Sequence, residues 1–149
     1  MAAKTSLKHV VQDSHGNSIK VRSKLEADFA TLLNNFETDY WYEESKVDYV
    51  IPESNHKYTV DFTTKNGIYW ELKGWLENHA ERTKYVLIKQ QHPELDIRFV
   101  FANPQKLCGG TKMTHAKWAE KYEFPYCSIK DTETIKAWSK EKPSKRKQK

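Results

Sequence analysis

Residues 58–73 read as two strands joined by a turn, and this hairpin constrains the fold of the chain more than any other feature. The runs Tyr58–Phe62 and Ile68–Lys73 are rich in β-branched and aromatic residues, which favour strands. Between them, Lys65–Gly67 contains an Asn-Gly pair, a strong signal for a tight turn. The sequence therefore predicts an antiparallel strand pair near the middle of the chain.

The second strand of this hairpin carries an acid and a base on the same side. Because side chains alternate along a strand, Glu71 and Lys73 share one face, and the other face is apolar, with Ile68, Trp70 and Leu72. Charges beside an apolar face are costly to bury, and chemistry on a phosphate group would justify them. The alternative is an ordinary solvated face of an exposed hairpin, since so short a pattern also arises by chance.

The register of the hairpin decides whether Asp61 joins that pair. A two-residue turn at Asn66-Gly67 would place Asp61 opposite Leu72, on the apolar face. A three-residue loop over Lys65–Gly67, with its glycine in the left-handed conformation, places Asp61 opposite Glu71 instead. We predict the three-residue loop, because only this register brings the two carboxylates and the lysine together.

The composition of the chain restricts its class. With 149 residues, it is expected to form one domain. No apolar run approaches the length that spans a membrane, and the first residues do not resemble a secretory signal. Cys108 and Cys127 are too few for a disulfide framework or a zinc site, so we expect reduced thiols, and the six histidines show no ligand-like spacing.

Charge is distributed unevenly along the chain, which has a net charge of +5. Met1–Lys24 holds five Lys/Arg and one Asp, and residues 140–149 hold six Lys/Arg and one Glu, so residues 25–139 carry a net charge of −4. Basic ends attract polyanions, whereas an acidic body repels them unless cations intervene. This combination suits a metal-dependent enzyme that acts on nucleic acid. Basic ends that only keep the chain soluble are the alternative.

Capping signals and hydrophobic periodicity predict an α/β domain with a mixed sheet flanked by helices. Ser23 opens a helix with a capping box, in which Glu26 is the third helical residue. In addition to the hairpin, the patterns predict strands over 40–42, 47–51 and 96–102 and helices over 77–91, 114–122 and 132–139. The crossover from 68 to 102 should join parallel strands, and the other strand pairs should be antiparallel.

This organisation divides the chain into three parts. We expect one folded domain over 22–139, which would be the nuclease domain of such an enzyme. A mobile basic arm over 1–21 should precede it, and a disordered basic tail over 140–149 should follow it. The arm is assigned because its residues show no periodicity, and the tail because of its composition.

The hairpin predicts a metal site for phosphodiester hydrolysis. Asp61 and Glu71 offer the hard oxygen ligands that Mg²⁺ prefers, and the carbonyl of Leu72 is a candidate further ligand. Lys73 can hold a water or a phosphate oxygen as a point charge, and the neighbouring carboxylates should keep it protonated. A divalent ion can lower the pKa of a coordinated water and stabilise the leaving oxygen.

A second metal ion would need another carboxylate, and Glu26 is the candidate. The capping box explains a glutamate at this position equally well, and spacing alone does not show whether the helix start approaches the hairpin. Glu43 and Glu44 are weaker candidates, which we expect to be solvated. His56, at the mouth of the hairpin, is either a structural residue or a contact for DNA phosphate.

Longer runs of the chain resemble the endonuclease I family of T-odd coliphages, whose members resolve four-way (Holliday) DNA junctions. The resemblance covers about half of the chain and is far more specific than the short motif. It rests on Arg22-Ser23-x-Leu25-Glu26, on Tyr42-Glu43-Glu44-x-Lys46-Val47-x-Tyr49-Val50-Ile51-Pro52-x-Ser54-Asn55-His56-x-Tyr58-Thr59-x-Asp61-Phe62, on Asn66-Gly67-Ile68-x-x-Glu71-x-Lys73-Gly74 and on His92-Pro93-Glu94-Leu95-Asp96-Ile97-Arg98-x-Val100-Phe101. The first 20 residues and the region after Phe101 match loosely or not at all.

This resemblance implies a restriction-endonuclease-like core with a PD-(D/E)xK site at Asp61, Glu71 and Lys73, and with Glu26 as an additional metal ligand. The family's site takes two divalent ions, Mg²⁺ or Mn²⁺ as its substitute. Its members are intertwined, domain-swapped homodimers, and residues 52–56 resemble their bridge. By this analogy Glu26 of one chain would complete the site of the other, and the two sites would nick opposing strands of a junction in the cytoplasm of the infected bacterial host.

One visible position departs from the family pattern, because the family's proline before the aspartate is Val60 in this chain. Proline cannot donate a hydrogen bond to a sheet and fixes its own φ, whereas valine can serve in a strand. We expect activity to be kept, with a less rigid Asp61 and an effect on the rate.

The sequence thus predicts a structure-selective, metal-dependent endodeoxyribonuclease for branched DNA. Phosphate contacts are expected from the basic tail and from Lys4, Lys8, Lys20 and Arg22. The alternative is a junction-binding architectural protein without turnover, which the basic ends and a dimer would serve equally well but which does not explain a carboxylate trio with a lysine. A sequence-specific restriction enzyme would share the core, but nothing in the sequence identifies a base-reading element.

Overall fold

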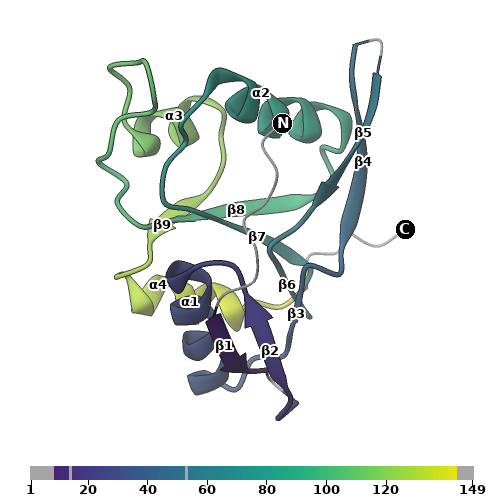
Figure 1. Ribbon diagram of the computed structural model, residues 1–149, viewed down its shortest axis with the longest axis vertical. Helices are drawn as coiled ribbons and strands as arrows, with labels where there is room; N and C mark the ends of the chain where they lie inside the picture. Colours follow the sequence, from purple (N-terminus) through teal and green to yellow (C-terminus); the bar gives the residue numbers. More distant parts are fainter. Residues whose placement is uncertain (1–8, 14, 53, 144–149) are drawn as a thin grey trace.

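The computed structural model describes residues 9–13, 15–52 and 54–143, and its central feature is a mixed sheet between two pairs of helices (Figure 1). The sheet has five strands in the order β3 (Tyr40–Tyr42), β6 (Phe62–Thr64), β7 (Ile68–Lys73), β8 (Asp96–Phe101) and β9 (Tyr126–Ser128). Helices α1 (Lys24–Asn35) and α4 (Thr132–Ser139) cover one face, and α2 (His79–Gln91) and α3 (His115–Lys121) cover the other (Figure 1). The predicted α/β class is confirmed.

Alternation along β7 assigns its side chains to two separate cores. Its apolar residues Ile68, Trp70 and Leu72 are buried on the side of α1 and α4. The opposite core contains Tyr85 of α2, Phe99 of β8 and Trp118 of α3. Because alternate residues point to opposite faces, this leaves Glu71 and Lys73 on the side of α2, as the sequence predicts.

The β6–β7 hairpin has the predicted register. Phe62 pairs with Trp70, which requires a loop of three residues between the strands. Gly67 closes this loop with a φ of 91°, a left-handed conformation that favours glycine. The next pair outward sets Asp61, the residue before β6, opposite Glu71.

The parallel crossover is confirmed, but the sheet contains one parallel pair that we did not expect. β7 pairs in parallel with β8 through α2, as predicted, and β8 also pairs in parallel with β9. The prediction that all other pairs are antiparallel was therefore wrong for β8–β9. Three residues of β9 are too few to give a periodic signal.

The run Tyr58–Phe62 does not form one strand, which is a second correction. β5 (Ser54–Thr59) pairs with β4 (Lys46–Ile51) in a separate two-stranded sheet, and the strand that pairs with β7 begins only at Phe62. The chain bends between the two strands, where the amide of Val60 donates to the carbonyl of Ser45 at 3.0 Å.

The N-terminal segment has more structure than its lack of periodicity indicates. β1 (His9–Gln12) and β2 (Ser18–Val21) form an antiparallel hairpin that contacts α1. Four-residue strands are too short to show periodicity, so the sequence did not reveal this hairpin, and the mobility of the arm stays a prediction. Residues 1–8 lie outside the described residues.

The predicted tail also begins later than its composition suggests. Glu141 receives two hydrogen bonds from the guanidinium of Arg98, both at 2.9 Å, and its carbonyl accepts from Asn66 Nδ2 at 2.9 Å. These contacts hold Glu141 against the domain, and the disorder of the tail stays a prediction. Residues 144–149 lie outside the described residues.

Two expectations from composition concern residues that the structure describes. Cys108 and Cys127 are both buried free thiols. None of the described helices is long and apolar enough to cross a membrane.

Candidate active site

Asp61 and Glu71 lie side by side at the open end of the β6–β7 hairpin, opposite its loop, and both are buried. The carboxylate of Asp61 accepts a hydrogen bond from the amide of Leu72, with an Oδ2–N distance of 3.0 Å. Asp61 is 3% exposed and Glu71 is 2% exposed. This hydrogen bond fixes Asp61 against β7 although the residue itself stands outside the strand. The predicted pairing of the two carboxylates is therefore present.

Two tyrosines hold the carboxylate of Glu71, one on each oxygen. The hydroxyl of Tyr58 in β5 donates to Oε1 at 2.6 Å, and the hydroxyl of Tyr85 in α2 donates to Oε2 at 2.8 Å. Burial and the charge of Glu71 raise the pKa of both phenols well above the usual value, so both remain hydrogen-bond donors. Glu71 is consequently oriented from two different elements.

Lys73 lies between two carboxylates. Its Nζ is 3.7 Å from Oε2 of Glu71 and also donates a hydrogen bond to Glu81 in the first turn of α2. Burial lowers the pKa of this lysine, but the charges of Glu71, Glu81 and Asp61 outweigh it, and the pKa is raised. The expected protonated lysine is therefore supported, and α2 supplies the partner that fixes its position.

Glu26 also approaches the hairpin, and it does so together with Glu43. Within the described residues, Glu26, Glu43 and Asp61 each offer a carboxylate oxygen within 4.8 Å of the others. The expectation that Glu43 is solvated was wrong, since its side chain is only 15% exposed. Its backbone has a φ of 54°, a left-handed conformation that is uncommon outside glycine and that occurs preferentially at functional sites.

Neighbouring side chains keep Glu26 and Glu43 in place. Ser23 caps α1 by accepting from the amide of Glu26 at 3.1 Å, while the Glu26 carboxylate accepts from the amide of Arg22 at 2.9 Å and from the hydroxyl of Tyr42 at 2.7 Å. The guanidinium of Arg22 donates to both oxygens of Glu43, at 2.8 and 3.1 Å. The predicted hydrogen bond from the Glu26 amide to the Ser23 side chain is therefore present. The Glu26 carboxylate accepts from Arg22 and Tyr42 and lies beside Glu43 and Asp61.

The donor set of this acidic group fits a divalent metal ion. Three carboxylates that converge from α1, from the loop after β3 and from the start of β6 provide hard oxygen ligands, which Mg²⁺ and Mn²⁺ prefer. The interior position strengthens their mutual repulsion, and a bound cation would relieve it. Arg22 offsets part of this charge through Glu43.

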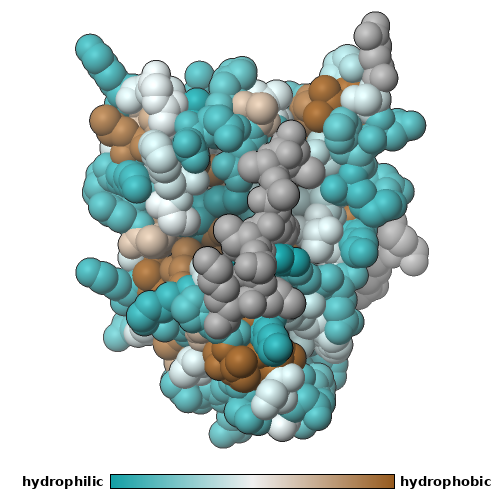
Figure 2. Space-filling view, in the orientation of Figure 1, coloured by the Kyte–Doolittle hydropathy of each residue, from teal (hydrophilic) through white to brown (hydrophobic). Residues whose placement is uncertain are grey.

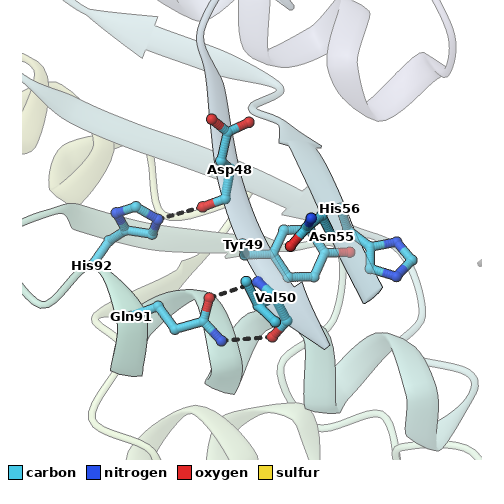
Figure 3. A pocket seen from close by; sticks show the side chains of 7 residues that line it. All are labelled: Asp48, Tyr49, Val50, Asn55, His56, Gln91 and His92. Carbon is cyan, nitrogen blue, oxygen red and sulfur yellow. Dashed lines mark hydrogen bonds between the residues drawn. The ribbon is translucent and has the colours of Figure 1, made fainter. Parts of the chain in front are cut away.

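Within this chain, Glu26 lies beside Asp61, and the exchange between two chains that the family resemblance implied stays a prediction. Of the segment expected to act as a bridge, Ser54, Asn55 and His56 form the start of β5, which pairs with β4. Figure 3 shows how this hairpin is held to α2. The side-chain amide of Gln91 donates to the carbonyl of Val50 and accepts from its amide, both at 2.6 Å.

The residues predicted to contact DNA are scattered. Lys20 is exposed on β2, and Arg22 is engaged with Glu43. His56 stacks on Tyr49, with ring centroids 5.4 Å apart, and lines the pocket drawn in Figure 3. Lys4 and Lys8 lie outside the described residues. Their contacts with DNA stay predictions.

Sequence reasoning missed Glu81 and Tyr85 of α2 and misjudged Glu43. Asn78 caps α2 by accepting from the amide of Glu81 at 2.8 Å, so an Asn-x-x-Glu capping signal was available. Tyr85 follows one helical turn later on the same face. Glu43 gave no such signal, because its position depends on how the loop after β3 meets Asp61.

Removing the hydroxyl of Tyr85 should weaken metal binding without unfolding the protein. Tyr85→Phe keeps the aromatic packing but leaves Oε2 of Glu71 without its phenol donor. Loss of an outer-shell partner typically costs about 10- to 100-fold in metal affinity or activity. Calorimetric titration with Mn²⁺ measures this loss. Tyr126→Phe, which removes only a hydrogen bond to exposed Glu120, is the matched control and should leave the affinity unchanged.

The fold and the site together define an α/β protein with a buried carboxylate–lysine centre suited to a divalent ion. A model of the phage endonuclease I family matches residues 7–148. The chain is 43% identical to endonuclease I of Escherichia phage T7 over 124 residues, which span 82% of this chain and 83% of that protein. It is 44% identical to endodeoxyribonuclease 1 of Enterobacteria phage T3 over 102 residues, 68% of this chain and 66% of that protein. The chain belongs to the phage endonuclease I family.

Proposed function

We propose that the protein is a metal-dependent endodeoxyribonuclease that hydrolyses phosphodiester bonds in branched DNA, in particular in four-way junctions. Its membership of the phage endonuclease I family supports DNA hydrolysis. So do the names of its relatives, endonuclease I of phage T7 and endodeoxyribonuclease 1 of phage T3. The observation that carries the reaction is the convergence of Asp61, Glu71 and Lys73 beside Glu26 in one buried acidic centre.

The residues of this centre have distinct roles in the proposal. Asp61, Glu71 and Glu26, with the carbonyl of Leu72, hold divalent ions, Mg²⁺ or Mn²⁺, two in each site. Bound ions supply an activated water and stabilise the charge on the leaving oxygen. Lys73 assists the attacking water by holding it, or a phosphate oxygen, through its ammonium group. Tyr58, Tyr85 and Glu81 keep Glu71 and Lys73 in position.

Two such sites in a homodimer would nick opposing strands across a junction in the cytoplasm of the infected host cell. Paired nicks are tested with a supercoiled plasmid that extrudes a cruciform. Two nicks within one binding event convert the plasmid directly to the linear form, whereas independent nicks give the open circle first. The non-catalytic architectural alternative predicts a plasmid that stays supercoiled in Mg²⁺ and in Mn²⁺.

The end of the chain is expected to add affinity that does not depend on DNA sequence. A deletion should begin at Ser144, because Glu141 is anchored to Arg98, and it removes Lys145, Arg146, Lys147 and Lys149. Each lost phosphate contact should reduce the slope of log K against log salt by about 0.9. Binding isotherms from 50 to 200 mM salt measure the slope. An unchanged slope would assign these residues to solubility.

A further inference from the structure

Trp75, two residues after Lys73, forms an exposed apolar surface together with Leu107. Trp75 is 43% exposed and Leu107 is 49% exposed, although both residue types are usually buried. The indole Nε1 donates to the carbonyl of Leu107 at 3.1 Å, and Nζ of Lys106 lies 4.8 Å from the centre of the indole ring. We call Trp75, Leu107 and Lys106 the indole platform. Figure 2 shows hydrophobic surface among hydrophilic surface over the loop between β8 and α3, which carries Leu107.

Buried polar contacts make this platform rigid from below. The carbonyl of Leu76 accepts from Arg82 Nη1 at 2.8 Å and from the amide of Gly109 at 3.0 Å, and its amide donates to Nε2 of His115 at 3.1 Å. Gly109 lies so close to Glu77 that an added Cβ would stand 1.8 Å from the Glu77 carbonyl oxygen. These contacts fix the backbone at Leu76 and Gly109, on the two segments that carry the platform.

The surroundings of the platform favour a polyanion. Residues 102–119 contain three lysines and neither Asp nor Glu, although residues 25–139 as a whole carry a net negative charge. Lys106, Lys112 and Lys117 are all exposed. Lys117 pairs with Glu120 at 3.9 Å, and Glu77 is the exposed acid next to the platform, so Lys106 and Lys112 carry most of the positive charge there. An exposed indole within a basic segment combines an aromatic face for a base with charge for a phosphate, which is how proteins bind unstacked nucleotides.

The platform also lies where a DNA strand would leave the candidate active site. β7 and β8 are parallel neighbours, and Lys73 pairs with Phe101 at their carboxyl ends. The segments that carry Trp75 and Leu107 follow these two ends directly. Ligands of α/β sheets bind at the carboxyl ends of the strands. Trp75 is two residues after Lys73, and two residues span at most about 7 Å between Cα atoms.

We propose that Trp75 stacks on an unstacked base of the DNA strand next to the cleaved phosphate, while Lys106 pairs with an adjoining phosphate. This proposal rests on the proposed function and names the part of the substrate that the platform takes. Unstacking costs least where a base is already single-stranded or has lost a stacking neighbour, as at the opened exchange point of a four-way junction, and it costs most in an intact duplex. The platform thus favours branched DNA over linear duplex.

Binding of the full-length protein to a fluorescent four-way junction, with Ca²⁺ in place of Mg²⁺ and with intact DNA verified on a gel, tests the proposal. Trp75→Ala should raise Kd about 5- to 150-fold, which corresponds to about 1–3 kcal/mol per stacked base. Trp75→Phe keeps an aromatic face and should stay within about threefold of the wild type. The same alanine substitution should leave the weaker affinity for an intact duplex nearly unchanged.

Trp41→Ala is the matched control, because Trp41 is a second exposed tryptophan, 37% exposed, that lies away from the platform. It belongs to β3, the edge strand at the other side of the sheet from β9. This control variant should not change Kd. A folded Trp75→Ala protein with unaltered junction affinity would overturn the proposal. So would an equal loss of affinity for the intact duplex. A loss of junction affinity that sedimentation traces to dissociation of a dimer would also overturn it. Junction cleavage by the wild type is measured separately, so its absence would reject the nuclease function and not the stacking contact.

Discussion

Lys73→Ala should reduce junction cleavage by at least about a hundredfold and leave junction binding within about twofold. Loss of one preorganised electrostatic group in an active site costs about 10²–10³ in rate. Lys73 lies beside Glu71 and Glu81 in the interior of the site, so its removal changes the charge at the reacting phosphate and little of the DNA-binding surface. Single-turnover cleavage of a labelled junction in Mg²⁺ gives the rate, and anisotropy in Ca²⁺ gives the affinity.

Lys65→Ala is the matched control for this variant. Lys65 belongs to the loop of the same hairpin but is exposed, and its replacement should leave both quantities unchanged. Cleavage that survives Lys73→Ala would show that the assigned mechanism is wrong. Loss of binding together with cleavage would mean that Lys73 serves DNA affinity and not the chemical step.

Asp61→Asn should abolish metal binding at the acidic group and reduce cleavage by at least about a hundredfold. Asparagine can still accept the hydrogen bond from the amide of Leu72, so the fold should be retained, but one negative charge is lost beside Glu26 and Glu43. Negative carboxylates bind divalent ions more strongly than neutral amide oxygens do, and Asp61 contributes one of the three carboxylates of this group.

Calorimetric titration with Mg²⁺ or Mn²⁺ measures this effect without relying on cleavage. Asp48→Asn is the control, because Asp48 is an exposed carboxylate on β4 that pairs with Lys57. The control should bind metal like the wild type. Wild-type metal affinity in Asp61→Asn would remove Asp61 from the ligand set, and the metal site would then have to lie elsewhere.

The central hairpin could be predicted from sequence because its signals are local. The Asn-Gly pair and the alternation of apolar residues predict the hairpin and put Glu71 and Lys73 on one face. Two registers fit these signals, and the three-residue loop was predicted because it alone adds Asp61; the pairing of Phe62 with Trp70 confirms it. The same reasoning could not find β9, whose three residues are too short for a pattern. It also missed the β1–β2 hairpin, which is stabilised by its contacts with α1.

The rest of the candidate site depends on contacts between distant parts of the chain. Glu43 looked solvated because nothing near it in sequence reveals that its loop meets Asp61 and Glu26. Glu81 and Tyr85 reach the hairpin only because α2 returns across the sheet between the parallel strands β7 and β8. Capping explained Glu26 locally, and only the fold shows that its carboxylate lies beside those of Glu43 and Asp61.

At the family's proline position, Val60 has a structural role that a proline would not allow. Its amide donates to the carbonyl of Ser45, and its side chain is fully buried. Asp61 directly afterwards is fixed by the amide of Leu72. These two hydrogen bonds hold the backbone before Asp61 and the Asp61 carboxylate in place. The effect of Val60 on the rate stays a prediction.

Cleavage of a labelled four-way junction, compared with a linear duplex of matched sequence in Mg²⁺ and then in Ca²⁺, tests the central claim most directly. We expect symmetric nicks near the branch in Mg²⁺ alone, with the duplex spared. Tight junction binding without cleavage in either Mg²⁺ or Mn²⁺ would contradict it and would favour an architectural protein.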